Sequence, residues 1–391
     1  MAEVPDIIYL DYAASTPVDL RVVEAMSSLL TAEGNYANPS STHVEGRRAV
    51  DRIAHATQQL AQLLNTEPAR LIWTSGATES DNLAIIGVVR HREHRGKHLI
   101  TMRTEHKAVT DVFEALARQG FEITWLEPGP DGVLPLDTLE GAIRNDTQLV
   151  SIMHINNETG VIQDLERIGH ICRERDVVFH VDAAQSVGKL PIDLSALPVD
   201  LMSMTAHKVY GPKGIGALYI ADRPGVGVEP QLYGGGQQRR LRPGTQPAHQ
   251  IAGFGEAAEI AHESMHEDIE HLRGLRDRLW TSIADIPGVV VNGSLETGFP
   301  GILNVSVEDI EGESLLLALE PLCVATGSAC NSKSQEPSYV LRALGRTDAL
   351  AQSAIRFSFG RPTTTAEVDI AIQKYRDAVS KLRAIAPEQM P

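Results

Sequence analysis

The sequence predicts an α/β protein with a mostly parallel sheet in its larger domain and a smaller α+β domain beside it. The chain has 391 residues, more than one simple hydrophobic core needs, and this length suits two domains. From about residue 71 to residue 220, short apolar runs alternate with amphipathic helical patterns, which is typical of a parallel sheet covered on both faces. After residue 247 one long helical stretch is followed by strands and helices in mixed order, which favours an α+β arrangement.

Apolar periodicity and the positions of Gly and Pro predict the elements of the larger domain. A short strand over 7–10 precedes a loop with Pro17, and helices are expected over 19–30 and 45–64. We then expect strands over 71–74, 98–101, 122–126, 149–154, 177–181, 201–204 and 217–220, with helices over 83–89, 108–119, 136–143 and 165–174 between the first five of them.

A glycine-rich loop over 233–245 separates this series from the remaining elements. We expect a large domain over residues 16–260 and a small domain formed by residues 1–15 and 261–391. The remaining elements are expected as a helix over 247–283, strands over 289–291 and 302–307, a helix over 312–319, a strand over 355–359 and a helix over 366–385.

Composition narrows the class of protein. The chain has 35 basic and 51 acidic residues, a formal net charge of −16, which disfavours nucleic acid and anionic membrane surfaces as partners. Its three cysteines, Cys172, Cys323 and Cys330, form no C-x-x-C pair, so neither a disulfide framework nor a thiolate metal cage is expected. The acidic first residues and the lack of a long apolar run predict a cytoplasmic protein with no membrane anchor.

Two polar residues at predicted strand ends suggest a cofactor. Asp182 follows one apolar strand, and Lys208 follows the next, before a turn rich in Gly and Pro. A pyridoxal phosphate site requires this pair, because the Asp keeps the pyridine nitrogen protonated and the Lys holds the aldehyde as an imine. The turn over 75–82 leads from a strand into a helix, where free backbone N–H groups favour a phosphate. Taken singly, a surface Lys and a structural Asp are the commoner interpretations.

One motif in the predicted long helix matches a zinc-binding pattern. His262-Glu-Ser-Met-His266 matches the H-E-x-x-H pattern, in which two imidazoles bind zinc and Glu263 acts as general base. A metalloprotease is therefore a remote alternative. The neighbouring residues are densely charged and contain no further histidine motif for a third ligand, so a solvated helix face is the favoured interpretation.

Seven segments of the chain resemble the cysteine desulfurases of the class-V aminotransferase superfamily. The resemblance is closest to the bacterial housekeeping type of iron–sulfur cluster assembly, with the nitrogen-fixation type next. It implies a fold-type-I pyridoxal phosphate enzyme, homodimeric, that converts L-cysteine to L-alanine and passes the sulfur to acceptor proteins for iron–sulfur clusters, thio-cofactors or tRNA thiolation. The matching segments are Tyr9 to Asp19, Thr74 to Asn82, Thr104 to Val109, Asn156 to Gly160, Val181 to Asp193, Ala206 to Gly214 and Gly327 to Cys330.

The resemblance also implies roles for individual residues. The large domain would bind the cofactor through Lys208 on the aldehyde and Asp182 at the pyridine nitrogen. Arg356, with Asn157, would bind the substrate carboxylate, a bidentate task suited to a guanidinium. The other implied cofactor contacts are Gln185 and Asn157 near the ring hydroxyl, His106 stacked on the ring as an acid or base, Ala77, Thr78, Thr205 and His207 at the phosphate, and Thr245 at the phosphate from the other subunit.

Cys330 is the residue that the resemblance marks as the sulfur acceptor. The small domain would carry its loop, and Cys330 would hold the sulfur as a persulfide; no resident metal is implied, although Cys330 could transiently ligate a cluster shared with a scaffold protein. Since only about 3% of an ordinary thiol is ionised at pH 7, a base such as His106 would assist. An aminotransferase or a selenocysteine lyase on the same fold is the alternative. Departures from the family pattern at Asn331 and Pro243, and an early C-terminus, leave the acceptor protein open.

Overall fold

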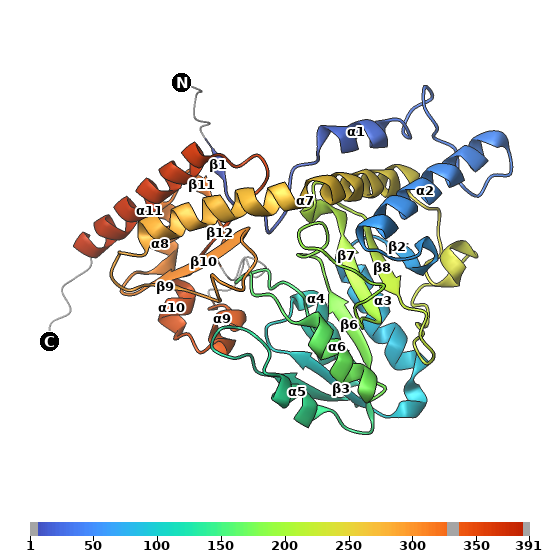
Figure 1. The fold of residues 1–391 in the computed structure, drawn as a ribbon, viewed down its shortest axis with the longest axis horizontal. Coiled ribbons are helices and arrows are strands. Elements are labelled where there is room, and N and C mark those ends of the chain that lie inside the picture. The colour runs from blue at the N-terminus through green and yellow to red at the C-terminus, as the bar shows by residue number, and fades with distance from the viewer. Residues whose placement is uncertain (1–6, 327–335, 386–391) are drawn as a thin grey trace.

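The computed structural model describes residues 7–326 and 336–385, which form two bodies with separate hydrophobic cores (Figure 1). The long helix α7 (Ala248–Ile283) runs along both of them. Its first half packs Ile251, Phe254 and Ala258 into the core of the larger body, and its second half packs Leu275 and Leu279 into the other. The expected helix over 247–283 is therefore confirmed, and it joins the two cores.

The larger body is built on a seven-stranded sheet with the strand order β2-β8-β7-β6-β5-β3-β4. The strand β8 is antiparallel to both of its neighbours, and the other strand pairs are parallel. The mostly parallel sheet predicted from the alternation of strands and helices is thus confirmed. The strands are β2 (Leu71–Thr74), β3 (His98–Met102), β4 (Glu122–Leu126), β5 (Thr147–Ser151), β6 (Val178–Asp182), β7 (Leu201–Thr205) and β8 (Gly216–Ile220).

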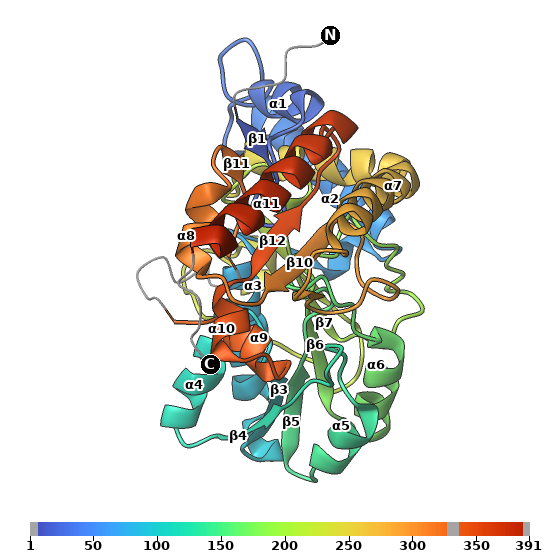
Figure 2. The ribbon, with the colours of Figure 1, turned by 90° about the vertical axis from the view of Figure 1, so that its left-hand side faces the viewer.

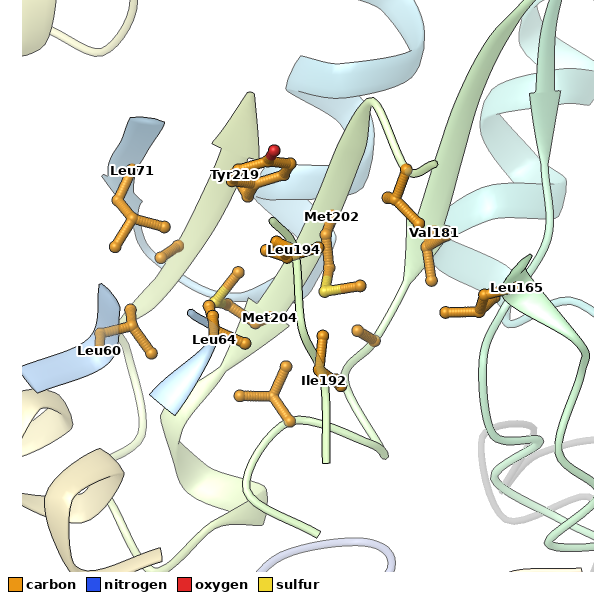
Figure 3. Packing of buried hydrophobic residues seen from close by; sticks show 14 of the residues in the cluster. Leu60, Leu64, Leu71, Leu165, Val181, Ile192, Leu194, Met202, Met204 and Tyr219 are labelled. Carbon is orange, nitrogen blue, oxygen red and sulfur yellow. The ribbon is translucent and has the colours of Figure 1, made fainter. Parts of the chain in front are cut away.

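Helices cover both faces of this sheet, as Figure 2 shows. Neighbouring residues of a strand point to opposite faces, so Leu201 packs toward one layer of helices and Met202 toward the other. In Figure 3, Met204 and Leu64 meet in the second of these layers. One face carries α3 (Ala77–His91) and α4 (Lys107–Arg118), and the other carries α2 (Val44–Leu63), α5 (Leu136–Ala142), α6 (Leu165–Glu174) and the first half of α7.

The smaller body contains an antiparallel sheet of order β12-β10-β9 and a separate parallel pair, β1 with β11. The first described strand therefore joins the C-terminal part of the chain. Helices α8 and α11 are close neighbours here. The elements are β1 (Ile8–Tyr9), β9 (Val289–Val291), β10 (Ile302–Val307), β11 (Leu322–Cys323), β12 (Ile355–Ser358), α8 (Gly312–Ala318), α9 (Tyr339–Ala343), α10 (Asp348–Gln352) and α11 (Thr365–Ile385); α1 (Leu20–Ser27) follows β1.

A few elements differ from the sequence expectations. Helix α3 begins at Ala77 rather than at residue 83, because its first turn is polar and lines a cavity instead of packing in the core. Helices α9 and α10 were not predicted, since five residues are too few to show helical periodicity. Within the described ranges, no helix is both long and apolar enough to cross a membrane.

Candidate active site

Most of the predicted site residues line one cavity, which has a volume of about 530 Å³. The topology explains why residues so far apart in the sequence meet. Strands β3, β5, β6 and β7 are parallel neighbours, so their carboxyl ends lie along one edge of the sheet. The predicted residues that line the cavity are Ala77, Thr78, His106, Asn157, Asp182, Gln185, Thr205, His207, Lys208 and Arg356.

One end of the cavity suits an anion. Gly76 precedes α3 with no side-chain cap on the first turn, so the N–H groups of the helix N-terminus are available to a ligand. Thr78 and Thr205 add hydroxyl groups to the same cavity. Burial and the neighbouring lysines, Lys208 first, lower the pKa of His207 to about 4, so its imidazole is a neutral hydrogen-bonding group at neutral pH. This donor set is typical of a phosphate site.

Asp182 lies at the buried end of β6, where Ala184 N–H donates to its Oδ1 at 2.9 Å. Two further acids, Asp81 and Glu105, are completely buried nearby. Burial is the main cause that raises the pKa of each well above its ordinary value, and the negative charge of Asp182 raises both further. Both shifts favour the protonated, neutral forms of Asp81 and Glu105.

His106 caps the N-terminus of α4 and lines the cavity at the same time. Its Nδ1 accepts the N–H of Ala108 at 3.1 Å, so in the neutral imidazole the proton is on Nε2. Burial lowers the pKa of His106 below its ordinary value, which favours this neutral form. The ring can therefore donate a hydrogen bond from Nε2. The role of His106 as an acid or a base stays a prediction.

Lys189 contacts the cavity-lining Gln185, and the sequence assigned it no role although it lies within the matching segment 181–193. Its Nζ donates to Gln185 Oε1 at 2.9 Å, and Gln185 Nε2 donates to the carbonyl of Ala13 at 2.7 Å. Because the carbonyl of Ala13 only accepts, the second contact fixes which way the Gln185 amide points. Burial, with the positive charges of Lys208 and Arg356, lowers the pKa of Lys189 to about 7. The signal in the sequence that could have identified Lys189 was its position four residues after Gln185.

Arg356 connects the smaller body to the cavity. It lies on β12 and is buried, and its Nη1 donates to the carbonyl of Asn157 at 2.7 Å. Its Nη2 donates to Asp11 Oδ1 at 2.6 Å. Among the described residues, its buried Nε has no hydrogen-bond partner. Arg356 therefore lies at the cavity, and Asp11 is a neighbour that the sequence did not identify.

The remaining two predicted residues are Thr245 and Cys330. Thr245 is exposed and does not line the cavity. Cys330 lies outside the described residues, so its predicted place at the site is not tested. His262 and His266 are on α7, and within residues 7–326 and 336–385 no group of three potential metal ligands forms, so the zinc hypothesis gains no third ligand there. Cys172 is buried and Cys323 is partly buried.

A second cavity of about 380 Å³ shares His106 and Asn157 with the first. Its buried wall contains Glu158, whose Oε2 accepts a hydrogen bond from the Ser338 hydroxyl at 2.5 Å. Ser338 also caps α9, so this contact holds the start of that helix against the larger body. Burial raises the pKa of Glu158 to about 7, well above the ordinary value for a glutamate.

Glu158→Gln is expected to remove a pH dependence of stability. Since the folded protein binds the Glu158 proton more tightly than the unfolded chain, Glu158 contributes stability that is complete below about pH 4.5 and is lost as the pH rises to about 7. Relative to the variant, the free energy of unfolding of the wild type should fall by about 2 kcal/mol between pH 5.5 and 8. Denaturant unfolding at both pH values measures this.

The exposed Glu33→Gln serves as the matched control for that experiment, and it should leave the pH dependence unchanged. A Glu158→Gln variant whose stability followed that of the wild type at both pH values would show that Glu158 ionises normally in the folded protein.

The comparisons with known proteins agree on one family. The model of the aminotransferase class-V family matches residues 8–370. The cysteine desulfurase IscS of Serratia proteamaculans (strain 568) is 56% identical over 381 residues, which cover 97% of this chain and 94% of the relative. The cysteine desulfurase IscS of Klebsiella pneumoniae (strain 342) is 55% identical over the same shares.

Solved structures agree with these relatives. A NifS-like protein superposes with a TM-score of 0.89 at 37% identity, over 96% of this chain and 100% of that protein. The structure of SspA in complex with cysteine has a TM-score of 0.80 at 36% identity, over 91% of this chain and 100% of SspA. The predicted fold class and the resemblance to cysteine desulfurases are therefore confirmed.

Proposed function

The chain belongs to the class-V aminotransferase family and, within it, to the cysteine desulfurases, and from this we propose that it converts L-cysteine to L-alanine and leaves the sulfur on Cys330. The observation that carries the proposal is the convergence of Lys208, Asp182 and the uncapped N-terminus of α3 on one cavity. Members of the family use pyridoxal phosphate. An amine, a buried carboxylate and an anion site in one cavity fit that cofactor.

Each group has a task in this cavity. The α3 N-terminus with Ala77, Thr78, Thr205 and His207 would hold the phosphate, Asp182 the pyridine nitrogen, and Gln185 and Asn157 the ring hydroxyl. When bound, the cofactor accepts the electron pair released at the substrate α-carbon. The Lys208 amine would attach the cofactor and move the α-proton, and the Nε2–H of His106 would donate a hydrogen bond to a group bound in the cavity. Arg356 would bind the substrate carboxylate.

Sulfur transfer needs no external oxidant or reductant. The Cys330 thiolate attacks the substrate sulfur, an S–S bond forms as the substrate C–S bond breaks, and the substrate carbon ends with a proton, as in alanine. The product on the chain is a persulfide, which acceptor proteins of iron–sulfur cluster assembly or thiolation pathways would consume. The proposal for Cys330 rests on its segment, Gly327 to Cys330, because the residue lies outside the described part of the chain.

One experiment tests the function directly. Purified protein is mixed with pyridoxal phosphate and L-cysteine, its absorption spectrum is followed, and alanine and sulfide are assayed in the presence of a dithiol reductant. Equal amounts of alanine and sulfide support the proposal. Steady conversion of an amino acid with a keto acid, and no sulfide, would instead identify an aminotransferase.

We also propose that two copies of the chain form the working enzyme. Leu20 on α1 is 78% exposed and Tyr233 is 83% exposed, and the surface of the α1–α2 region exposes further apolar side chains. Covering them with a second copy would remove apolar surface from water. Tyr233 begins the glycine-rich loop that ends at Thr245, so this copy would carry Thr245 toward the neighbouring phosphate site. The other exposed apolar residues of the α1–α2 region are Val23, Leu30, Tyr36, Val44 and Val50, and Leu232, next to Tyr233, is also exposed.

The dimer predicts a mass in solution of twice the 42.5 kDa of the chain, measured by light scattering at micromolar concentration. Leu20→Asp with Tyr233→Asp should shift the protein toward the single-chain mass, because two charges would be buried in the interface. A wild type that stayed at the single-chain mass would refute the dimer.

Domain division and cellular setting belong to the same proposal. The packing of α7 into two cores supports a large cofactor-binding domain over 16–260 and a small domain over 1–15 and 261–391, which carries the Cys330 loop.

The reaction leaves a reactive persulfide, which favours the reducing cytoplasm. No resident metal is proposed; Cys330 would at most share a cluster transiently with a scaffold protein.

A further inference from the structure

We propose that Asp11 is a positioning residue, which holds the guanidinium of Arg356 in the orientation that binds the carboxylate of the amino-acid substrate. The inference rests on the proposed function and assigns a role to a residue that does not itself line the active-site cavity. Its basis is the ion pair between Asp11 Oδ1 and Arg356 Nη2, at 2.6 Å. The Arg356 side chain is 6% exposed and that of Asp11 is 22% exposed.

The backbone around Asp11 is held firmly against β12. Asp11 forms a parallel bridge with Ser358, which is two residues beyond Arg356 on the strand. Ser358 N–H donates to the carbonyl of Leu10 at 2.8 Å, and Ala13 N–H donates to Ser358 Oγ at 2.9 Å. These bonds on both sides of Asp11 fix its backbone relative to β12, and the ion pair holds its carboxylate at Arg356, which is what a positioning residue requires.

The guanidinium is held at two points. Nη2 donates to Asp11, and Nη1 donates to the carbonyl of Asn157, which comes from the larger body. A guanidinium is planar and has its five N–H groups in fixed directions, so two anchored groups define the plane of all of them. Arg356 is therefore oriented before any substrate arrives.

Three N–H groups remain after these two contacts. One of them is on Nε, which is buried and has no partner among the described residues. Arg356 lines the cavity that contains Lys208, so these donors are available to an anion bound there. A carboxylate accepts two parallel N–H bonds from such a fork, and it would satisfy the buried Nε. The α-carboxylate of cysteine has this chemistry.

The alternative is that the Asp11–Arg356 pair only joins β1 to β12. In that case, loss of Asp11 would lower stability and leave the affinity for a carboxylate unchanged. The two interpretations differ in kinetics, because a positioning role appears in substrate binding and a joining role does not.

Asp11→Ala tests the proposal in the enzyme loaded with pyridoxal phosphate. We expect KM for L-cysteine to rise about tenfold or more, because a hydrogen bond to a charged group is lost, while kcat changes less than about threefold. The absorption of the bound cofactor also reports affinity for L-alanine and for ethylamine, which differ only by the carboxylate. Affinity for alanine should fall by a similar factor, and affinity for ethylamine should stay unchanged.

Two variants complete the series. Asp11→Asn keeps an acceptor oxygen and should restore KM to within about threefold of the wild type. If Asp11→Ala does not fold, Asp11→Leu, which has the same branching at Cγ but no acceptor, replaces it in the comparison. Asp369→Ala is the matched control, since it removes an aspartate paired with Arg278 on the smaller body, far along the chain from Asp11.

An unchanged or lower KM for Asp11→Ala would overturn the proposal, and so would an equal loss of affinity for alanine and ethylamine. Failure of the proposed function gives a different result, because the wild type would then release no sulfide and alanine from cysteine. The two failures are therefore distinguishable in one set of assays.

Discussion

Lys208→Ala is expected to abolish covalent attachment of pyridoxal phosphate and, with it, all desulfurase activity. Lys208 follows β7 at the carboxyl edge of the sheet and lines the same cavity as Asp182. Borohydride treatment of the wild type should fix the cofactor to the chain, whereas the variant should release it on denaturation. Activity should fall by roughly three orders of magnitude or more, because the variant lacks both the attachment point and the amine that moves the proton.

Lys189→Ala is the informative control for this experiment. Lys189 has a pKa near 7 and lies close enough to Lys208 to be influenced by its charge, so it is the other amine that could be attached. We expect Lys189→Ala to keep the borohydride-fixed cofactor. If the cofactor remained fixed in Lys208→Ala and was lost in Lys189→Ala, Lys189 would be the attachment point.

Cys330→Ser should stop sulfur release and leave cofactor binding intact. A hydroxyl cannot accept sulfur as a persulfide, while Lys208, Asp182 and Arg356 do not depend on the thiol. The cofactor spectrum should still respond to L-cysteine, and sulfide release should fall roughly a thousandfold or more. Alanine and sulfide assays after rapid mixing with cysteine measure both effects.

Cys323→Ser is the matched control, since Cys323 is a partly buried thiol on β11, in the same part of the chain. It should retain sulfide release. Full release by Cys330→Ser would contradict the assignment of Cys330, and loss of release in Cys323→Ser alone would transfer the role to Cys323.

The fold and the position of the site could be predicted because their signals are local. The bounds of α6 and β4 follow from apolar periodicity within each segment, and the structure has them at the expected residues. Alternation of strands and helices implies a parallel sheet, and a parallel sheet collects its strand ends at one edge. The proximity of Asp182 and Lys208 can therefore be predicted from the sequence.

The protonation states of side chains in and around the cavity could not be predicted, because they depend on burial. Sequence alone does not distinguish an exposed Glu158 or Lys189 from a buried one, and burial moves both pKa values close to 7 in opposite directions. The same holds for His106, whose capping of α4 assigns its proton to Nε2. The sequence left its role as acid or base open.

By itself, then, the sequence determined the α/β architecture, the cofactor and the identity of the residues on the strand ends, since periodicity and motif spacing are properties of neighbouring residues. The tertiary structure alone decided which distant groups became partners. Asp11 and Arg356 are 345 positions apart. They meet because β1 pairs with β11, and the residues that follow β1 run beside β12. Such a contact follows from packing and strand pairing over the whole chain, which no local pattern encodes.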